Sequence, residues 1–524
     1  MKSKRYLKIL IVLGTTILLI RFLTTVFVEP LTRRKIESIL NANNSAQVVV
    51  VGKVHVSMIS SGIKLNRITI RSKEDYSGVL NLSGVITSIK FKGIRLAKAI
   101  SKKEIDIRKV TISDSYFKGK ISFQGEAMHA IVLPLNIRIG SIHFDKINLS
   151  VENTSTAASF SLKDGFLKLY DIQLENQDTL SADIVKQFDF EAKELLSVTS
   201  DSMYLYKTIG ILYSATSNIM AVDSFFIQPN YTDYDFTSRH EFQTNRIEAG
   251  LSKIYIHDCN VSEYFRSGNL KSSFVEVGAM DMKIFRDKRK KIRHVNKPEF
   301  QDMIYNYPGI IQIDSIALSG GNVTYTEHSE KATEPGSVSF NEINAGIYKI
   351  TNDTIYKKET ASLELKGEAL LMGTGRMTIL LKARIFESQN TFSLNGTLSG
   401  LEASELNPIL EKKVSIYVTS GKIDSMNFSF IADNSKAIGK MIMLYNGLDI
   451  AVKNKRTDDT TALKERFISL LVNRKVLDSN PLPDEDVREG IIDYERDPER
   501  FIFGYCFKSI LSGIYSSLQR SSEK

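Results

Sequence analysis

The side chains that could do chemistry are few and scattered along the 524-residue chain. Its two cysteines, Cys259 and Cys506, are too far apart in sequence to predict a redox pair or a metal knuckle. The histidines occur singly, and none has the short spacing that places two metal ligands on one helix face or strand. They are His55, His129, His143, His240, His257, His294 and His328. The sequence therefore predicts neither a metal centre nor a fold built on disulfides.

Two charged segments are candidate binding sites. The run 286–294, RDKRKKIRH, is the densest positive cluster and could contact anionic headgroups or an acidic partner, although a solvated loop is the commoner role. The segment 493–500, DYERDPER, has no nucleophile or metal-ligand spacing and predicts a salt-linked helix start. No acid–base pair stands out in the chain. We therefore expect a protein that is not an enzyme and that needs no cofactor.

The composition is typical of a folded protein. Hydrophobic residues make up 42% and charged residues 25%, with only 10 prolines, which is far from the disordered class. The formal net charge is +9, but the 69 basic residues are spread among 60 acidic ones along the whole length. Nucleic-acid binding needs basic residues clustered on one face, so we expect no nucleic-acid partner.

A hydrophobic segment near the N-terminus predicts a membrane anchor. Residues 9–28, ILIVLGTTILLIRFLTTVFV, contain one charge, Arg21, and follow a basic stretch. As a helix they would extend ~30 Å, enough to cross the hydrocarbon core of a bilayer. A signal peptide is the alternative, but no small-x-small cleavage site follows. The basic flank predicts a cytoplasmic N-terminus and a translocated body, although basic residues at 33–35 weaken this bias.

The rest of the chain is dominated by strand patterns. A short helix is expected from Glu29, because Pro30 and spaced apolar residues follow. After it, apolar and polar residues alternate with period two, most regularly at 377–385, which predicts strands with one apolar face. Turn residues recur at short intervals and predict antiparallel neighbours. They include SGG at 319–321, EPGS at 334–337 and MGTG at 372–375.

Several predicted strands contain a one-residue slip in this alternation. In 135–152, apolar residues occupy Ile137 and Ile139 and then Ile142 and Phe144. Two inserted polar or small residues are what a β-bulge needs to restore the side-chain face and bend the strand. The alternatives are a turn between two short strands at each slip, or chance. The same shape occurs at 62–72, 103–115, 309–321 and 420–430.

Repeated bends favour a curved sheet. An open sheet usually tolerates ~10 strands, so a longer one must curl, close or stack. We expect a mainly β fold, an elongated antiparallel trough or solenoid whose apolar face lines a groove. A two-layer sandwich, with that face covered, is the alternative. The candidate lining residues are Ile137, Ile139, Ile142, Phe144, Leu363, Leu365, Met377, Ile379, Leu381, Phe392, Leu394, Leu398, Met426, Phe428 and Phe430.

The C-terminal tail predicts an amphipathic helix. Its apolar residues fall near one helical face, so the tail could lie on a membrane or plug the end of the groove, or it could dock on its own sheet. They are Phe503, Phe507, Ile510, Leu511, Ile514 and Leu518. Five segments are expected along the chain. They are a cytoplasmic N-terminus and anchor at 1–28, a helix and first groove segment at 29–200, a middle groove segment at 201–350, a C-terminal β segment at 351–460 and a helical tail at 461–524.

The final third resembles the AsmA-like proteins of bacterial envelopes. The resemblance lies in three segments, 392–410, 418–430 and 439–452, and in a tail, 480–514, similar to that of AsmA-like proteins from the Bacteroidetes type of envelope. The matching positions are Asn407, Pro408, Gly421, Ile423, Tyr445 and Leu448. VGKV at 51–54 and GIKLNRITI at 62–70 extend the resemblance to the N-terminal end, whereas residues 150–350 match only diffusely.

This resemblance implies a single-pass protein of the inner membrane, anchored by residues 9–28, with its body in the periplasm. It implies a β groove akin to that of bridge-like lipid-transfer proteins, which binds phospholipids or conducts them between membranes and supports outer-membrane homeostasis. Contacts with outer-membrane components are expected, and no catalytic residue is carried over. The alternative is an envelope scaffold, or a regulator of outer-membrane protein assembly, that transports no lipid.

Overall fold

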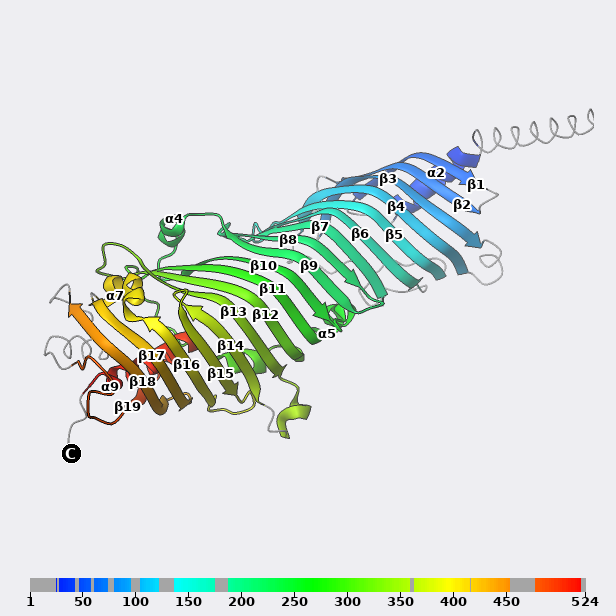
Figure 1. Ribbon diagram of the computed structural model, residues 1–524. Coiled ribbons are helices and arrows are strands. Elements are labelled where there is room, and N and C mark those ends of the chain that lie inside the picture. Colours follow the sequence, from blue (N-terminus) through cyan, green and yellow to red (C-terminus); the bar gives the residue numbers. More distant parts are fainter. Residues whose placement is uncertain are drawn as a thin grey trace, which may run out of the picture. The chain divides into compact units, whose positions relative to one another are not determined.

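The structure is a computed structural model, and it describes residues 25, 28–42, 47–57, 61–73, 80–95, 104–121, 136–174, 187–358, 362–414, 416–452 and 476–519. Within these residues the fold is mainly β, as the alternation predicts, with nineteen strands and six α-helices. The chain divides into two compact units, Met1–Ser217 and Asn218–Lys524. In each unit the strands lie side by side in one curved layer (Figure 1). The five-segment division stays a prediction.

The first unit begins with the helix expected from Glu29, α2 (Glu29–Ala42). Eight strands follow, each paired with the next along the chain. They are β1 (Gln47–Ser57), β2 (Gly62–Ser72), β3 (Leu80–Arg95), β4 (Glu104–Ile121), β5 (Asn136–Asn153), β6 (Ser159–Leu174), β7 (Gln187–Val198) and β8 (Tyr204–Ser214).

The second unit contains eleven strands, and here too each strand pairs with the next. They are β9 (Ile219–Pro229), β10 (Asn245–His257), β11 (Leu270–Asp287), β12 (Ile311–His328), β13 (Gly336–Thr351), β14 (Leu363–Leu371), β15 (Gly375–Ala383), β16 (Phe392–Glu402), β17 (Ile416–Ala432), β18 (Lys436–Val452) and β19 (Glu489–Glu495). The helices are α4 (Asp233–Ser238), α5 (Val261–Ser267), α6 (Phe300–Tyr305), α7 (Asn407–Val414) and α9 (Ile502–Ser517), with 3-10 turns η3 (Thr354–Lys358) and η4 (Ala403–Leu406).

Two neighbouring pairs are parallel, which corrects the expectation of an antiparallel sheet. These pairs are β4 with β5 and β11 with β12. Parallel neighbours need a connection of a dozen or more residues, and the connections at 122–135 and 288–310 have that length. The alternation in a sequence predicts which face of the sheet each side chain occupies, but not whether the neighbouring strand runs parallel or antiparallel. It therefore could not predict these crossovers.

One further expectation about local structure was wrong, and another is confirmed only in part. SGG at 319–321 is not a turn, because β12 continues through it and Gly320 adopts a φ of 79° inside the strand. The segment 493–500 begins on β19, and its later residues, with Asp497 paired to Arg500, lead directly into α9. The turns expected at 334–337 and 372–375 do join strands, β12 to β13 and β14 to β15.

The slips lie inside continuous strands, which excludes a turn between two short strands at each slip. A register shift of the β-bulge kind occurs at some slips, as between Ile423 and Ser425, whereas the partner strands stay in register across Leu65–Ile68. β5 runs unbroken through Ile139 and Ile142. In many slips the second inserted residue has a positive φ, as Arg67 does at 54° between Leu65 and Ile68. The left-handed conformation costs ~1–2 kcal/mol for a residue other than glycine. It returns the next apolar side chain to the face occupied by the apolar residue before the slip. Other residues with positive φ inside strands are Gly93, Asp114, Lys146, Asp164, Asp171, Gly210, Lys253, Gly320, Glu342, Lys349, Gly400, Gly421 and Gly447, all glycine or polar.

Helix α2 covers the outer edge of β1 in the first unit. The Val51 N–H donates to Oε1 of Glu37 at 2.7 Å. The carboxamide of Asn41 accepts from the Val49 N–H and donates to the Val49 carbonyl, both at 2.8 Å. These polar side chains occupy backbone groups that an edge strand would otherwise offer to another strand.

Helix α9 does the same for β19 in the second unit. The N–H of Ile491 donates to Oγ of Ser516 at 3.0 Å, and the N–H of Asp493 donates to Oγ of Ser512 at 3.3 Å. Small residues on this side of α9 allow the close approach. Helix α9 therefore blocks another strand from pairing with this edge of β19.

The predicted membrane anchor is the hydrophobic segment 9–28. Residues 9–28 lie outside the described residues, apart from positions 25 and 28. Among the helices that are described, none is both long and apolar enough to span a bilayer.

Candidate functional site

In the first unit, apolar side chains form continuous rows across the strands. Residues that pair directly on neighbouring strands share one face of the sheet. One row crosses all eight strands and consists of Val54, Leu65, Ile89, Ile112, Phe144, Leu167, Phe190 and Tyr213. A second row consists of Val56, Ile63, Phe91, Val110, Ile142, Leu169 and Phe188. One face of this unit is therefore apolar from its first strand to its last.

The row between these two lies on the opposite face and is polar. It consists of His55, Lys64, Lys90, Thr111, His143, Lys168, Asp189 and Ser214. Burial lowers the pKa of His143, and repulsion by Lys109 and Lys168 lowers it further. The two faces of the first unit thus differ sharply in polarity.

The second unit carries the same arrangement across its eleven strands. One row consists of Met220, Ile256, Val275, Ile316, Ile347, Leu365, Leu381, Leu394, Phe430, Gly439 and Ile492. Another consists of Val222, Ile254, Val277, Leu318, Ala345, Gly367, Ile379, Gly396, Phe428, Met441 and Gly490. No polar side chain interrupts either row. Gly396 leaves space for a neighbouring aromatic ring, since a Cβ at this position would collide with the ring of Phe428.

The apolar face of the second unit is closed at its C-terminal end. The ring of Tyr505 on α9 meets Phe392 edge-on at 6.0 Å, and Ile510 and Ile514 pack into the same cluster. Burial alternates strictly along β17, in step with the side-chain face, from Met426 to Ala432. Helix α9 therefore covers this end of the face.

Towards β9 the same face is less covered. β9 has no fully buried residue, and β10 has only Ala249. Ile254 and Ile256, which belong to the two rows, are half-buried. Apolar side chains of this part remain in partial contact with solvent, which is uncommon for a continuous apolar surface unless something binds there.

Every candidate lining residue lies on a described strand, and the structure brings these residues together in two groups. The four on β5 lie in the first unit, where Ile142 and Phe144 belong to the two rows, and Ile137 and Ile139 to an adjoining cluster. The remainder form one cluster in the second unit. One of them, Phe392, contacts Tyr505 of α9 and also the ring of Phe430. Sequence reasoning missed the residues of β9–β13, whose alternation is obscured by slips.

The predicted apolar face of the tail is divided between two environments. Ile510, Ile514 and Leu518 pack on the sheet. Phe503 and Phe507 are instead 86% and 53% exposed. Leu511 is half-buried. The tail helix thus docks on its own sheet and still presents aromatic residues to solvent.

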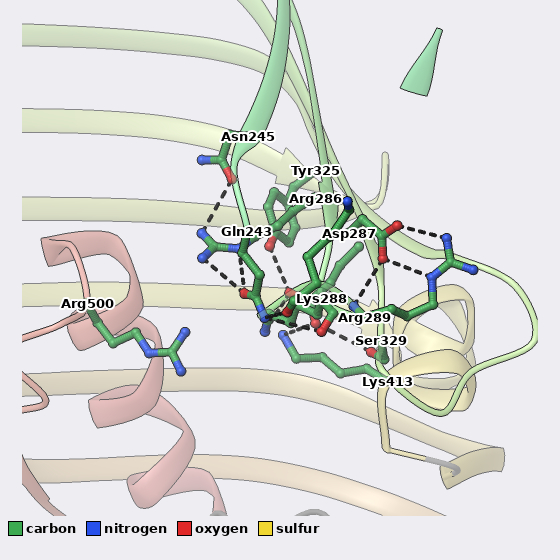
Figure 2. Close-up of polar contacts among 12 residues, drawn as sticks. Gln243, Asn245, Arg286, Asp287, Lys288, Arg289, Tyr325, Ser329, Lys413 and Arg500 are labelled. Carbon is green, nitrogen blue, oxygen red and sulfur yellow. Dashed lines mark hydrogen bonds and ion pairs between the residues drawn. The ribbon is translucent and has the colours of Figure 1, made fainter. Parts of the chain in front are cut away.

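The basic run 286–294 begins at the end of β11 and leads into a buried polar cluster (Figure 2). Glu327, only 2% exposed, accepts from Lys288 Nζ and from the Tyr325 hydroxyl, both at 2.8 Å. Lys413 Nζ lies 3.4 Å from the other carboxylate oxygen. Burial alone would raise the pKa of Glu327, but the attraction of Lys413 and Lys288 outweighs it and lowers this pKa to about 2. Burial also lowers the pKa of Lys288 to about 8, despite the attraction of Glu327.

The start of the run is also tied to the strands. Arg289 pairs with Asp287 through Nε at 2.9 Å and Nη2 at 2.8 Å. Arg286 donates to Gln243 at 3.3 Å and to Asn245 at 3.4 Å (Figure 2). These contacts give the first residues of the run a structural role, whereas Lys291 and Arg293 are exposed.

The two thiols are weakly acidic, and Cys259 is buried whereas Cys506 is half-buried. Burial raises the pKa of Cys259, and burial raises that of Cys506 to about 12. A thiol is a poor nucleophile while it stays protonated. Among the described residues, no three potential metal ligands lie close enough to hold an ion.

The residues that carry the family resemblance have structural roles here. The carboxamide of Asn407 at the start of α7 accepts from the Val418 N–H at 2.8 Å and donates to its carbonyl at 2.9 Å. This repeats the contact of Asn41 with Val49 in the first unit. Gly421 has a φ of 124° and approaches Leu448 closely. In both units, an asparagine on a helix thus pairs with the backbone of the strand that follows.

The fold and the rows define a protein whose candidate site is a surface and not a pocket of reactive groups. No family model matches this chain, and no curated protein sequence matches it significantly. The likeness to AsmA-like proteins therefore rests on the motifs described above.

Proposed function

We propose that this protein binds the acyl chains of phospholipids along the apolar faces of its strands and passes lipids between two membranes. The observation that carries the proposal is the pair of unbroken apolar rows across all strands of the second unit, half-buried at Ile254 and Ile256. A face that served only as a core would be expected to be covered throughout, as it is beneath α9.

The energetics support this use of the surface. Each CH₂ group removed from water contributes ~0.8 kcal/mol, so an acyl chain gains from a lining without interruptions. The seven strands β9–β15 lie outside the end that α9 covers, and at a spacing of ~4.8 Å they make a row of about 30 Å, as long as the ~30 Å hydrocarbon core of a bilayer. This part of each row can therefore accommodate an acyl chain, which crosses only one leaflet, with the headgroup left in water.

The setting of this activity belongs to the same proposal. Residues 9–28 anchor the chain in a bacterial inner membrane, and the body forms a periplasmic trough that resembles the groove of AsmA-like proteins. Phospholipids are the cargo, the outer membrane is the second membrane, and the protein performs no catalysis. The support is the anchor-like hydrophobic segment, the motifs around Asn407 and the slipped strands.

Lipid extraction and mass spectrometry of the purified full-length protein test the proposal. Phospholipid should be recovered in stoichiometric amounts after washing that removes loosely held detergent and lipid. Protein that is monodisperse and empty after mild purification would contradict acyl-chain binding.

A second candidate is an envelope scaffold that transports no lipid and assists outer-membrane protein assembly. The closed end of the second unit, where α9 covers β16–β19, favours it. The same extraction separates the two functions, since a scaffold should contain no stoichiometric lipid.

A further inference from the structure

An exposed surface at the start of α9 combines aromatic and basic residues. We call it the aromatic–basic surface and define it as Phe501, Phe503, Phe507, Lys413 and residues 288–297. Phe501 is 48% exposed, and Phe503 and Phe507 are more exposed still. Within 288–297, Ile292 and Val295 are also exposed, at 39% and 45%. The opposite side of α9 is buried on the sheet, so these rings are exposed on a helix that is already docked.

The cations of this surface lie directly beside its rings. Lys297 Nζ is 5.5 Å from the centre of the Phe501 ring, and Lys413 Nζ is 5.6 Å from that of Phe507. Residues 288–297, KRKKIRHVNK, contain six lysines and arginines and no acidic residue. Lys288 and Lys413 pair with Glu327, and Arg289 pairs with Asp287, so the positive charge of the surface comes from the later residues of the segment. These are Lys290, Lys291, Arg293 and Lys297.

Specific contacts hold the basic segment against the start of α9. The Lys297 N–H donates to the Pro498 carbonyl at 2.8 Å, and His294 Nδ1 lies 3.0 Å from Glu499. The nearby carboxylate of Asp497 is 3.2 Å from Arg500. Glu499 and Asp497 are thus in contact with the basic side chains of His294 and Arg500, and the exposed Lys291 and Arg293 place positive charge towards solvent.

We propose that the aromatic–basic surface docks on an anionic lipid bilayer. Phenylalanine rings insert at the boundary between headgroups and acyl chains, while lysine and arginine side chains attract anionic headgroups. A protein partner fits less well, because the cores of protein interfaces are depleted in lysine, and here lysines adjoin the rings. This docking goes beyond acyl-chain binding and does not depend on it, since the surface contacts a membrane whether or not the strands contain lipid.

Tryptophan fluorescence of the full-length chain can test the docking, because the protein contains no tryptophan. Phe503→Trp places a single indole on the surface. The matched control is Phe265→Trp on α5, where Phe265 is 69% exposed. Both variants retain the N-terminal hydrophobic segment, so a difference between them reports the site of the indole. Vesicles of phosphatidylcholine, with or without phosphatidylglycerol, are then added, and in a parallel series their acyl chains are brominated.

With phosphatidylglycerol present, the emission of Phe503→Trp should shift to shorter wavelength and be quenched by brominated chains, while Phe265→Trp should not respond. Adding Lys291→Gln and Arg293→Gln to Phe503→Trp should reduce the phosphatidylglycerol-dependent shift and quenching of the indole several-fold, because two attractions to anionic headgroups are lost. The proposal is overturned by an equal response to phosphatidylcholine alone, by no response, or by an equal response of Phe265→Trp. A shift caused by added protein extract and by neither vesicle type would assign the surface to a protein partner. A negative result here does not affect how much lipid is extracted from the protein, so membrane docking and acyl-chain binding can each be rejected independently.

Discussion

At the residue scale, the most constrained group is the carboxylate of Glu327. It is fully buried and faces two lysines, Lys288 and Lys413. Removing one partner of a buried ion pair lowers the free energy of unfolding by more than the intact pair contributes to it, because the remaining charge stays buried without a partner. The contacts that hold β12, α7 and the connection after β11 together therefore depend on the Glu327 carboxylate.

Replacing Glu327 with glutamine should lower the free energy of unfolding by about 3 kcal/mol, because two cations lose their anion. Denaturant unfolding of the variant and of the unchanged protein measures the difference. The control is Glu334→Gln, which removes the exposed partner of Lys412, 2.8 Å away, and should change little. Equal effects of the two substitutions would contradict the role given to Glu327.

The low pKa of Glu327 also predicts a dependence on acid. Its pKa lies near 4.5 in the unfolded chain and about 2 in the folded protein, so the folded state favours the ionised form. The resulting stabilisation is complete above about pH 4.5 and is lost as the pH falls towards 2. Unfolding measured across this range should show the loss in the unchanged protein and a smaller one in Glu327→Gln. Identical pH profiles would count against this assignment.

At the element scale, α9 closes one end of the apolar face, and Gly513 makes its close approach possible. A Cβ at Gly513 would lie 2.7 Å from Cγ1 of Ile492 and 3.0 Å from Cε of Met441. A Cβ at Gly504 on the same helix would meet only Arg500, at an ordinary 3.5 Å. Gly513 is thus packed tightly against the sheet, whereas Gly504 has room for a side chain.

The same substitution at these two positions should have opposite effects. Gly513→Ala should lower the free energy of unfolding by about 1–2 kcal/mol through overpacking, whereas Gly504→Ala should raise it by about 0.5–1 kcal/mol through helix propensity. Thermal or denaturant unfolding measures both changes. Stabilisation by Gly513→Ala would show that α9 does not pack on β18 and β19 as described.

The apolar rows make a prediction about neighbouring residues on one strand. Ile256→Asp places a charge in a row of the second unit, at a half-buried position of β10, and should reduce lipid recovery several-fold while the protein stays folded. Tyr255→Asp changes the adjacent residue, which is 42% exposed on the other face, and should leave lipid recovery unchanged. Mass spectrometry of extracts and circular dichroism measure the two quantities. Equal lipid loss in both variants would argue against a binding face.

Much of this element structure could be predicted from sequence, for reasons that are local. Period-two alternation predicts strands, and the polar residue or glycine at the second inserted position marks a slip, as Arg67 and Gly93 do. The parallel crossovers and β19 could not be predicted, because partner choice depends on connections and on contacts distant in sequence. Docking of α9 through Tyr505 and Gly513 also depends on tertiary contacts with Phe392 and Ile492.

At the scale of the whole molecule, each unit builds its candidate site from cross-strand repetition and not from a few reactive groups. Each apolar row takes one residue from each successive strand, and the slips keep the next row on the same face. Each unit also begins or ends with a helix that covers an edge strand, α2 over β1 and α9 over β19. A surface of this kind suits a ligand defined by length and apolarity, which an acyl chain is.

Photo-crosslinking with a phospholipid that carries a diazirine in its acyl chain tests the central claim most directly. After illumination of the full-length protein, peptide mass spectrometry locates the modified residues. The account predicts adducts at half-buried row residues such as Ile256 and Val275, and none at Tyr255 and Glu276, their neighbours on the other face. Adducts confined to the polar face, or no adducts on the described strands, would contradict acyl-chain binding by the apolar rows.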